Sequence, residues 1–167
     1  ITPAESIAPF ESGGGCQRLT DIISVPLAFG TGGSLRLGAG VGNPGYFTYA
    51  EMIAEMQSLE SSYPLLLDVF SIGISANGNT IYAVKISDNV AANENEPELL
   101  FTALQHAREA ISGTGMIFFM QYLLENYTTD TRVQSMVNNR ELYIVPCVNP
   151  DGYMYNYSGA SASYPVT

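Results

Sequence analysis

The first regular spacing of hydrophobic residues along the chain is that of a helix. It predicts a helix that ends at Tyr63-Pro64. Thr48 and Glu51 have the spacing of a capping box, in which each side chain accepts a hydrogen bond from the other residue's backbone N–H. Phe47 and Met52 are placed to form the hydrophobic staple that often accompanies this motif. The apolar residues from Met52 onward fall on one face, so we expect an amphipathic helix of about four turns.

Apolar runs of strand length follow this helix. Residues 65–74 and 81–86 are rich in β-branched and aromatic side chains, and residues 75–79 between them have the composition of a turn. Together they predict a β-hairpin. Residues 99–104 and 142–148 are two further apolar runs, which predict buried strands.

Two more helices are expected between the last two strands. Residues 107–127 carry apolar side chains around nearly the whole circumference of a helix, which predicts a buried helix, with Gly113 and Gly115 allowing a neighbour to approach closely. Residues 130–138 predict a shorter helix capped by Thr129. This order of elements predicts an α/β fold, a mixed β-sheet with helices packed on it.

Residues 1–46 show neither the helical nor the strand spacing of hydrophobic residues, and they contain three glycine clusters. We expect a leader, a linker or the remnant of a pro-segment, with short strands around residues 22–27 and 34–37. No Gly-Lys-Ser/Thr follows the glycines, so nucleotide binding is not expected. Residues 47–167 carry all the sustained periods, and the motifs described below indicate that they are the N-terminal part of a larger domain. Because the chain begins at Ile1 and shows no signal peptide, we expect that an upstream segment has been removed.

Composition excludes several classes of partner. Six basic residues against 16 acidic ones give a net charge of -10, which disfavours nucleic acid and anionic lipid. The longest uninterrupted apolar run, residues 116–120, is far shorter than the ~20 residues of a membrane span. A single lysine with abundant Gly, Ser, Tyr and Asn is typical of secreted proteins, so we expect an extracellular or periplasmic location. The two cysteines leave two alternatives open, a buried free thiol at Cys147 or a Cys16–Cys147 disulfide.

The one histidine of the chain, His106, directly follows the strand predicted at residues 99–104. Open α/β sheets bind their ligands at the carboxyl ends of strands. Glu109 follows three residues later, and an imidazole with a carboxylate is a natural pair of zinc ligands. The spacing alone is equally compatible with a site that binds no metal. In that case His106 is an ordinary histidine, and Glu109 is an acid stabilised by the positive end of a helix.

A second motif, Asn149-Pro150-Asp151-Gly152, follows the strand predicted at residues 142–148. Taken by itself it is typical of a turn, in which Pro150 fixes φ, Asp151 bonds to the backbone and Gly152 adopts positive φ. We therefore expect a turn-like tail over residues 149–167. This strand can open onto the same edge of the sheet as His106.

In their order along the chain, these motifs resemble those of the M14 zinc carboxypeptidases, which are the carboxypeptidase A and B-like enzymes. The resemblance rests on Phe47-Thr48-Tyr49-Ala50-Glu51-Met52, Ile72-Gly73, Gly78-Asn79-Thr80-Ile81, His106-Ala107-Arg108-Glu109 and Asn149-Pro150-Asp151-Gly152-Tyr153. It implies the three-layer fold of that family, with His106 and Glu109 as the first two zinc ligands and Arg108 lining the peptide-binding groove. It also implies a metallocarboxypeptidase that hydrolyses the C-terminal bond of peptides or proteins with a zinc-activated water.

The chain departs from this family downstream of the Asn-Pro-Asp-Gly motif. In the family, the second zinc histidine, the arginines and tyrosine that bind the substrate, and the catalytic glutamate all lie after that motif. The chain has no histidine besides His106 and no arginine after Arg140. We therefore expect only the N-terminal half of a catalytic domain, inactive alone, with no catalytic residue of its own and a third zinc ligand beyond Thr167. The C-terminal half of the domain would be its partner, and a strand edge and an apolar helix face should be exposed.

Two other functions remain compatible with these residues. One is a non-catalytic binding or structural module that keeps the carboxypeptidase scaffold, although intact His106 and Glu109 disfavour it. The other is a related zinc amidohydrolase of the desuccinylase or aspartoacylase kind, which fits the Asn149–Tyr153 run less well.

Overall fold

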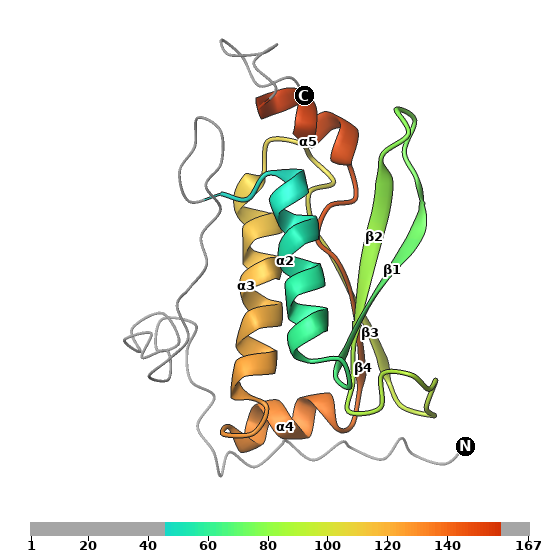
Figure 1. Ribbon diagram of the computed structural model, residues 1–167, viewed down its shortest axis with the longest axis vertical. Helices are drawn as coiled ribbons and strands as arrows, with labels where there is room; N and C mark the ends of the chain where they lie inside the picture. The colour runs from blue at the N-terminus through green and yellow to red at the C-terminus, as the bar shows by residue number, and fades with distance from the viewer. Residues whose placement is uncertain (1–45, 158–167) are drawn as a thin grey trace, which may run out of the picture. The chain divides into compact units, whose positions relative to one another are not determined.

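The computed structural model describes residues 46–157, which form a mixed β-sheet with helices packed against one face (Figure 1). The elements in chain order are α2 (Tyr49–Ser62), β1 (Leu67–Ile74), β2 (Thr80–Ile86), β3 (Glu98–Thr102), α3 (Ala110–Asn126), α4 (Thr131–Val137), β4 (Glu141–Val145) and α5 (Pro150–Tyr157). The strand order is β1-β2-β4-β3, with β3 and β4 parallel and the other two pairs antiparallel. The predicted α/β class and mixed sheet are confirmed.

Three predictions lie outside the described residues. These are the leader, of which only Tyr46 is described, its two short strands, and the pairing of Cys16. Among the described residues, Cys147 is a buried free thiol, and burial raises its pKa to about 12. No helix in the described part of the chain is both long and apolar enough to cross a bilayer.

Helix α2 begins where the sequence predicts. The Thr48 backbone N–H donates to Glu51 Oε2 over 2.7 Å, and the Glu51 N–H donates to Thr48 Oγ1 over 3.2 Å. Phe47 and Met52 are both buried beside this capping box, as a hydrophobic staple requires. The start of the helix is therefore set by residues that are neighbours in the sequence.

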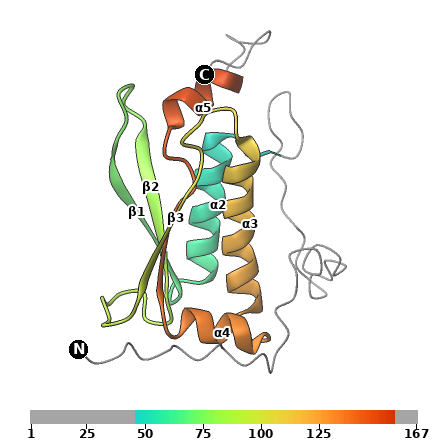
Figure 2. The same ribbon diagram turned by 180° about the vertical axis from the view of Figure 1, so that it is seen from behind.

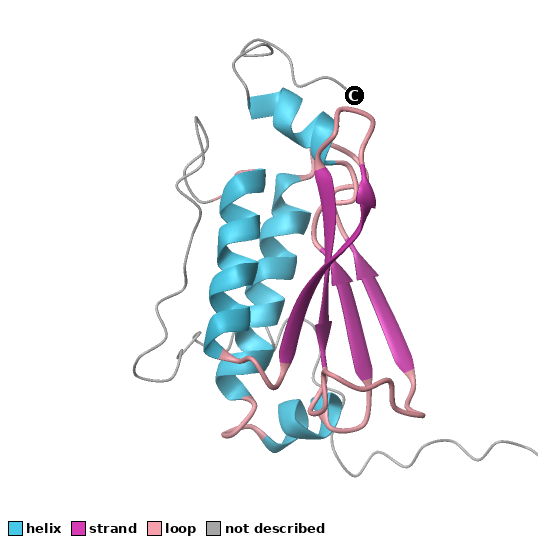
Figure 3. Ribbon diagram, turned by 45° about the vertical axis from the view of Figure 1, so that its right-hand side comes forward, coloured by secondary structure: helices cyan, strands magenta, loops and turns pink. Residues whose placement is uncertain are grey.

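Helix α3 packs beside α2 on the same face of the sheet, as the views from behind and from the side show (Figures 2 and 3). A Cβ on Gly113 would lie 2.5 Å from Leu104 Cδ1 and 2.7 Å from Met52 Cε, so the close approach predicted there is confirmed. The prediction for Gly115 is wrong, because a Cβ there would meet nothing within 4 Å. Burial on all sides is also wrong for α3. Ile111 is 66% exposed, since α2 and the sheet contact only one side of the helix.

Strand β3 forms an edge of the sheet within residues 46–157. Leu100 on this strand is 68% exposed, because no helix of the described part covers the second face of the sheet. The expected exposed strand edge and apolar helix surface are thus both found. A third layer is not formed by the residues that the structure describes.

The tail predicted over residues 149–167 is wrong in its described part, because residues 150–157 form helix α5. Asn149 caps this helix through its Oδ1, which accepts the Gly152 N–H over 3.0 Å, and Pro150 occupies the first helical position. Gly152 does not have positive φ, unlike Gly73 and Gly78. The motif is therefore a helix start and not an isolated turn.

The single lysine of the chain is buried and joins the β2–β3 loop to the sheet. Lys85 Nζ lies 2.8 Å from Glu141 Oε1 and also donates to the carbonyl of Ala92. The same Glu141 oxygen accepts the Glu94 N–H over 2.8 Å, and Oε2 accepts the Tyr143 hydroxyl over 3.0 Å. With these partners, the pKa of Glu141 is held below its usual range, first by the hydrogen bond from Lys85.

Candidate metal site at the carboxyl end of β3

His106 and Glu109 lie on one tight turn between β3 and α3. The Glu109 backbone N–H donates to the His106 carbonyl over 3.1 Å, which closes the turn. His106, Arg108 and Glu109 are exposed, whereas Ala107 between them is buried. The turn thus offers one imidazole and one carboxylate, both of which are donor types found in zinc sites.

The imidazole of His106 is oriented by its own turn. Its Nδ1 accepts the Arg108 backbone N–H over 3.2 Å, so in the neutral ring the proton lies on Nε2. A metal bound at Nε2 would keep this hydrogen bond, and one bound at Nδ1 would replace it. Arg108 contributes its backbone here, while its guanidinium is on an exposed side chain.

The segment between β4 and α5 is hydrogen-bonded to the residues that lead into this turn. The Val148 N–H donates to the Ala103 carbonyl over 3.0 Å, and the Asn149 N–H donates to the Leu104 carbonyl over 3.1 Å. The Asn149 side-chain amide reaches the Gln105 carbonyl at 3.3 Å. The structure therefore places the Asn-Pro-Asp-Gly motif at the same end of the sheet as His106, as predicted.

Leu104 is a strained residue at the entrance of the turn that sequence reasoning missed. It is fully buried and has a φ of 52°, a conformation that costs energy for a non-glycine residue. Its N–H donates to Ser112 Oγ over 3.1 Å, and Ser112 Oγ donates in turn to the Glu109 carbonyl over 2.7 Å. Nothing in a leucine within an apolar run signals this backbone geometry.

Asp151, in the first turn of α5, binds the tip of the β1–β2 hairpin. Its Oδ1 accepts the Ser75 hydroxyl over 2.6 Å and the Asn79 side-chain amide over 2.7 Å, and its Oδ2 accepts the Asn77 backbone N–H over 3.0 Å. The hydrogen bonds from Ser75 and Asn79 hold the pKa of Asp151 below its usual range. The sequence predicts only a backbone hydrogen bond within a turn for Asp151, so the contact with the hairpin is found only in the structure.

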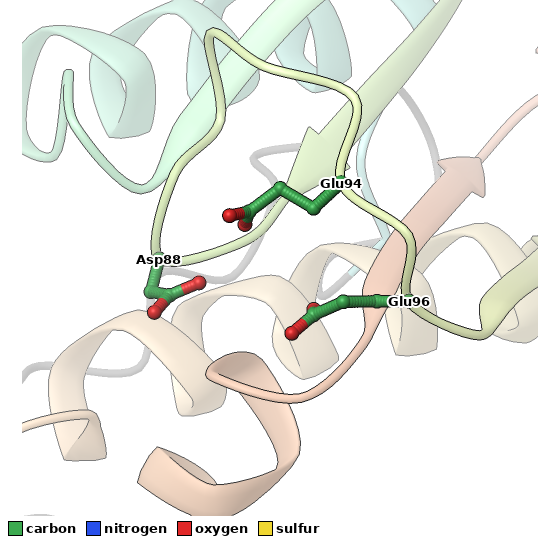
Figure 4. Close-up of side chains that lie close together, drawn as sticks. All are labelled: Asp88, Glu94 and Glu96. Carbon is green, nitrogen blue, oxygen red and sulfur yellow. The ribbon is translucent and has the colours of Figure 1, made fainter.

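A separate acidic cluster, which the sequence analysis did not single out, lies in the β2–β3 loop. One carboxylate oxygen from each of Asp88, Glu94 and Glu96 lies within 4.8 Å of the others (Figure 4). Burial, with Glu94 and Asp88 nearby, raises the pKa of Glu96. This loop precedes β3, whereas His106 follows it, so the cluster lies at the opposite end of the strand and offers carboxylates only.

Comparisons with known proteins agree with the fold and the motifs. The family model of the zinc carboxypeptidases (Peptidase_M14) matches residues 52–164. The zinc carboxypeptidase of Saccharothrix mutabilis subsp. capreolus is 35% identical over 120 residues, which are 72% of this chain and 28% of that protein.

Solved structures show the same arrangement of elements. Carboxypeptidase A from Helicoverpa armigera superposes with a TM-score of 0.61 at 26% identity, over 69% of this chain and 27% of that one. Thrombin activatable fibrinolysis inhibitor gives a TM-score of 0.64 at 23% identity, over 69% of this chain and 28% of that one, and this likeness concerns the fold alone. The family match covers well over half of the chain, and the chain belongs to the zinc carboxypeptidase family.

Proposed function

We propose that His106 and Glu109 are zinc ligands of a metallocarboxypeptidase that removes C-terminal residues from peptides or proteins. The observation that carries this proposal is the His106–Glu109 turn, which is closed by a 3.1 Å backbone hydrogen bond and presents both side chains at the surface. Family membership supports the chemistry. The chain spans 28% of the length of the Saccharothrix relative, so the activity is proposed for the whole protein.

The described residues would hold the metal and orient the substrate. Zinc, when bound, would lower the pKa of a water molecule and polarise the scissile carbonyl. His106 supplies a neutral imidazole and Glu109 a carboxylate, while the exposed Arg108 offers a cation to the peptide. The chain has one histidine, so a second imidazole would come from residues outside the 167. We propose the same origin for the general base.

A peptidase assay on the protein at its native length tests this function. We expect release of the C-terminal residue from a set of peptides, loss of release on adding a zinc chelator, and recovery with added zinc. His106→Ala should lower kcat/KM at least about 100-fold, because a metal ligand is lost. Glu125→Gln, at an exposed glutamate of α3, serves as the control and should leave the rate unchanged. Full activity of His106→Ala would refute the proposed role.

We also propose that the protein works outside the cytosol. The composition supports this, with one lysine in 167 residues and many Gly, Ser, Tyr and Asn. Fractionation of the source cells tests it, and recovery of the protein in the cytosol alone would contradict it.

A further inference from the structure

Helix α5 contacts the candidate metal-binding turn through a side chain that no motif singled out. Asn156 Nδ2 donates to the Ala107 carbonyl over 2.6 Å, although the two residues lie 49 positions apart. Ala107 is 5% exposed and lies directly between His106 and Arg108. The one buried residue of the turn is therefore held by a side chain from outside the turn.

A second contact on the same face of α5 restrains the same residue. Gly152 lies one helical turn before Asn156, and residues four apart share a face of a helix. A Cβ on Gly152 would lie 3.0 Å from Ala107 Cβ and 2.7 Å from Asn149 Nδ2. The helix thus packs its backbone against Ala107 while Asn156 fixes the carbonyl orientation.

From these contacts we infer that Asn156 is a positioning residue for the His106–Glu109 turn. The turn's internal hydrogen bonds run from Arg108 N–H to His106 Nδ1 and from Glu109 N–H to the His106 carbonyl. Neither involves the Ala107 carbonyl, so Asn156 supplies a restraint that the turn itself lacks. The role of this hydrogen bond in metal binding rests on the proposed function. The hydrogen bond itself restrains the turn whether or not the turn binds zinc.

Asn156 is also the first residue of an Asn-Tyr-Ser triplet, the acceptor pattern for N-glycosylation. A glycan would be attached to Nδ2, the same nitrogen that lies 2.6 Å from the Ala107 oxygen. The other such triplet begins at Asn126, whose Nδ2 donates to the Tyr122 carbonyl over 2.8 Å. The hydrogen bond of Asn126 stays within its own helix, whereas that of Asn156 joins α5 to the turn 49 positions earlier.

Hydrogen exchange on Asn156→Asp, without added metal, tests the restraint. The substitution keeps the size of the side chain and replaces the donor with an oxygen that faces the Ala107 carbonyl. We expect the Arg108 and Glu109 amides to exchange about tenfold faster, as the loss of one hydrogen bond implies, while amides of the β2–β4 pairing stay unchanged. The NMR signal of the His106 ring should shift as well.

A matched control and a second variant make the result decisive. Asn139→Asp removes a similar bond, from an exposed amide to the Ser135 carbonyl at 2.8 Å, and should leave the turn unchanged. Gly152→Ala, which would press on Ala107 from the same helix, should perturb the same amides as Asn156→Asp.

Zinc affinity gives a readout beyond exchange. Asn156→Asp should weaken zinc binding about tenfold, as is typical when a partner that orients a ligand is removed. Unchanged exchange at Arg108 and Glu109, or equal acceleration of all amides, would overturn the inference. If the unmodified protein does not bind zinc through His106, the proposed function fails while the exchange result still decides the role of Asn156.

Discussion

At the scale of single residues, Asp151 joins two segments that lie more than 70 positions apart in sequence. Its carboxylate accepts hydrogen bonds from Ser75, Asn77 and Asn79 at the tip of the β1–β2 hairpin. Because α5 also holds the His106 turn through Asn156, Asp151 connects the hairpin with the candidate metal site. We therefore expect a change at Asp151 to affect the free energy of unfolding more than the metal affinity.

Asp151→Asn should destabilise the protein in a pH-dependent way. The folded state favours the ionised carboxylate and lowers its pKa, so this stabilisation is present above the pKa of the unfolded chain, about 4, and is lost as pH falls through the folded value. Urea unfolding should show a less stable variant at pH 7 and a smaller difference at pH 3, below the pKa of the unfolded chain. Asp68→Asn, at an exposed position of β1, is the control. An equal difference at both pH values would contradict the role of the charge.

Some site residues could be predicted from the sequence and others could not. His106 and Glu109 could be singled out because their residue types and spacing suit a metal next to a strand end. Leu104 and Asn156 could not. The strain of the first is a property of the backbone, and the bond of the second joins residues 49 apart.

At the scale of elements, α3 contains two glycines with opposite surroundings. A Cβ at Gly113 would come within 2.7 Å of two buried side chains, whereas a Cβ at Gly115 would meet no atom within 4 Å. Glycine inside a helix costs about 1 kcal/mol relative to alanine. Of the two positions, only Gly113 lacks the space for a larger residue.

Gly115→Ala should therefore raise the free energy of unfolding by about 0.5–1 kcal/mol. In Gly113→Ala the same gain is opposed by overpacking of about 1–3 kcal/mol, so this variant should be less stable than Gly115→Ala by about 1 kcal/mol or more. Urea unfolding of both variants measures the difference. Equal stabilisation by the two substitutions would show that the contacts of Gly113 are not tight.

Helices α2 and α3 and the four strands were predictable because each has a strong local period or cap. The capping box of α2 and the apolar strand runs are signals of this kind. Helix α4 was also predicted, but its cap is Asp130, whose side chain accepts the Arg132 N–H, and not Thr129 as expected. Helix α5 was missed because Pro150 and Gly152 favour a turn when read alone, although Asn before Pro at the first helical position also signals a helix start. The attachment of the β2–β3 loop through buried Lys85 was not predictable, since lysine is normally exposed.

At the scale of the whole molecule, the order of motifs carried more information than any single motif. It predicted the zinc carboxypeptidase family, which the match over residues 52–164 confirms. Within the described part, β3 is an edge strand with Leu100 68% exposed, and one face of the sheet has no helix on it. The third layer that the family resemblance implies is not formed by residues 46–157, because none of their helices covers this face of the sheet.

The central claim is that His106 and Glu109 bind zinc together, and the presence of one histidine makes a direct measurement possible. In a zinc titration followed by ¹⁵N NMR of the imidazole, a single set of ring signals reports on His106. We predict a saturable shift of these signals with zinc, which is lost or strongly weakened in Glu109→Gln and kept in Glu96→Gln of the separate acidic cluster. Ring signals of His106 that stay unchanged at saturating zinc, or that respond equally in Glu109→Gln, would contradict the claim.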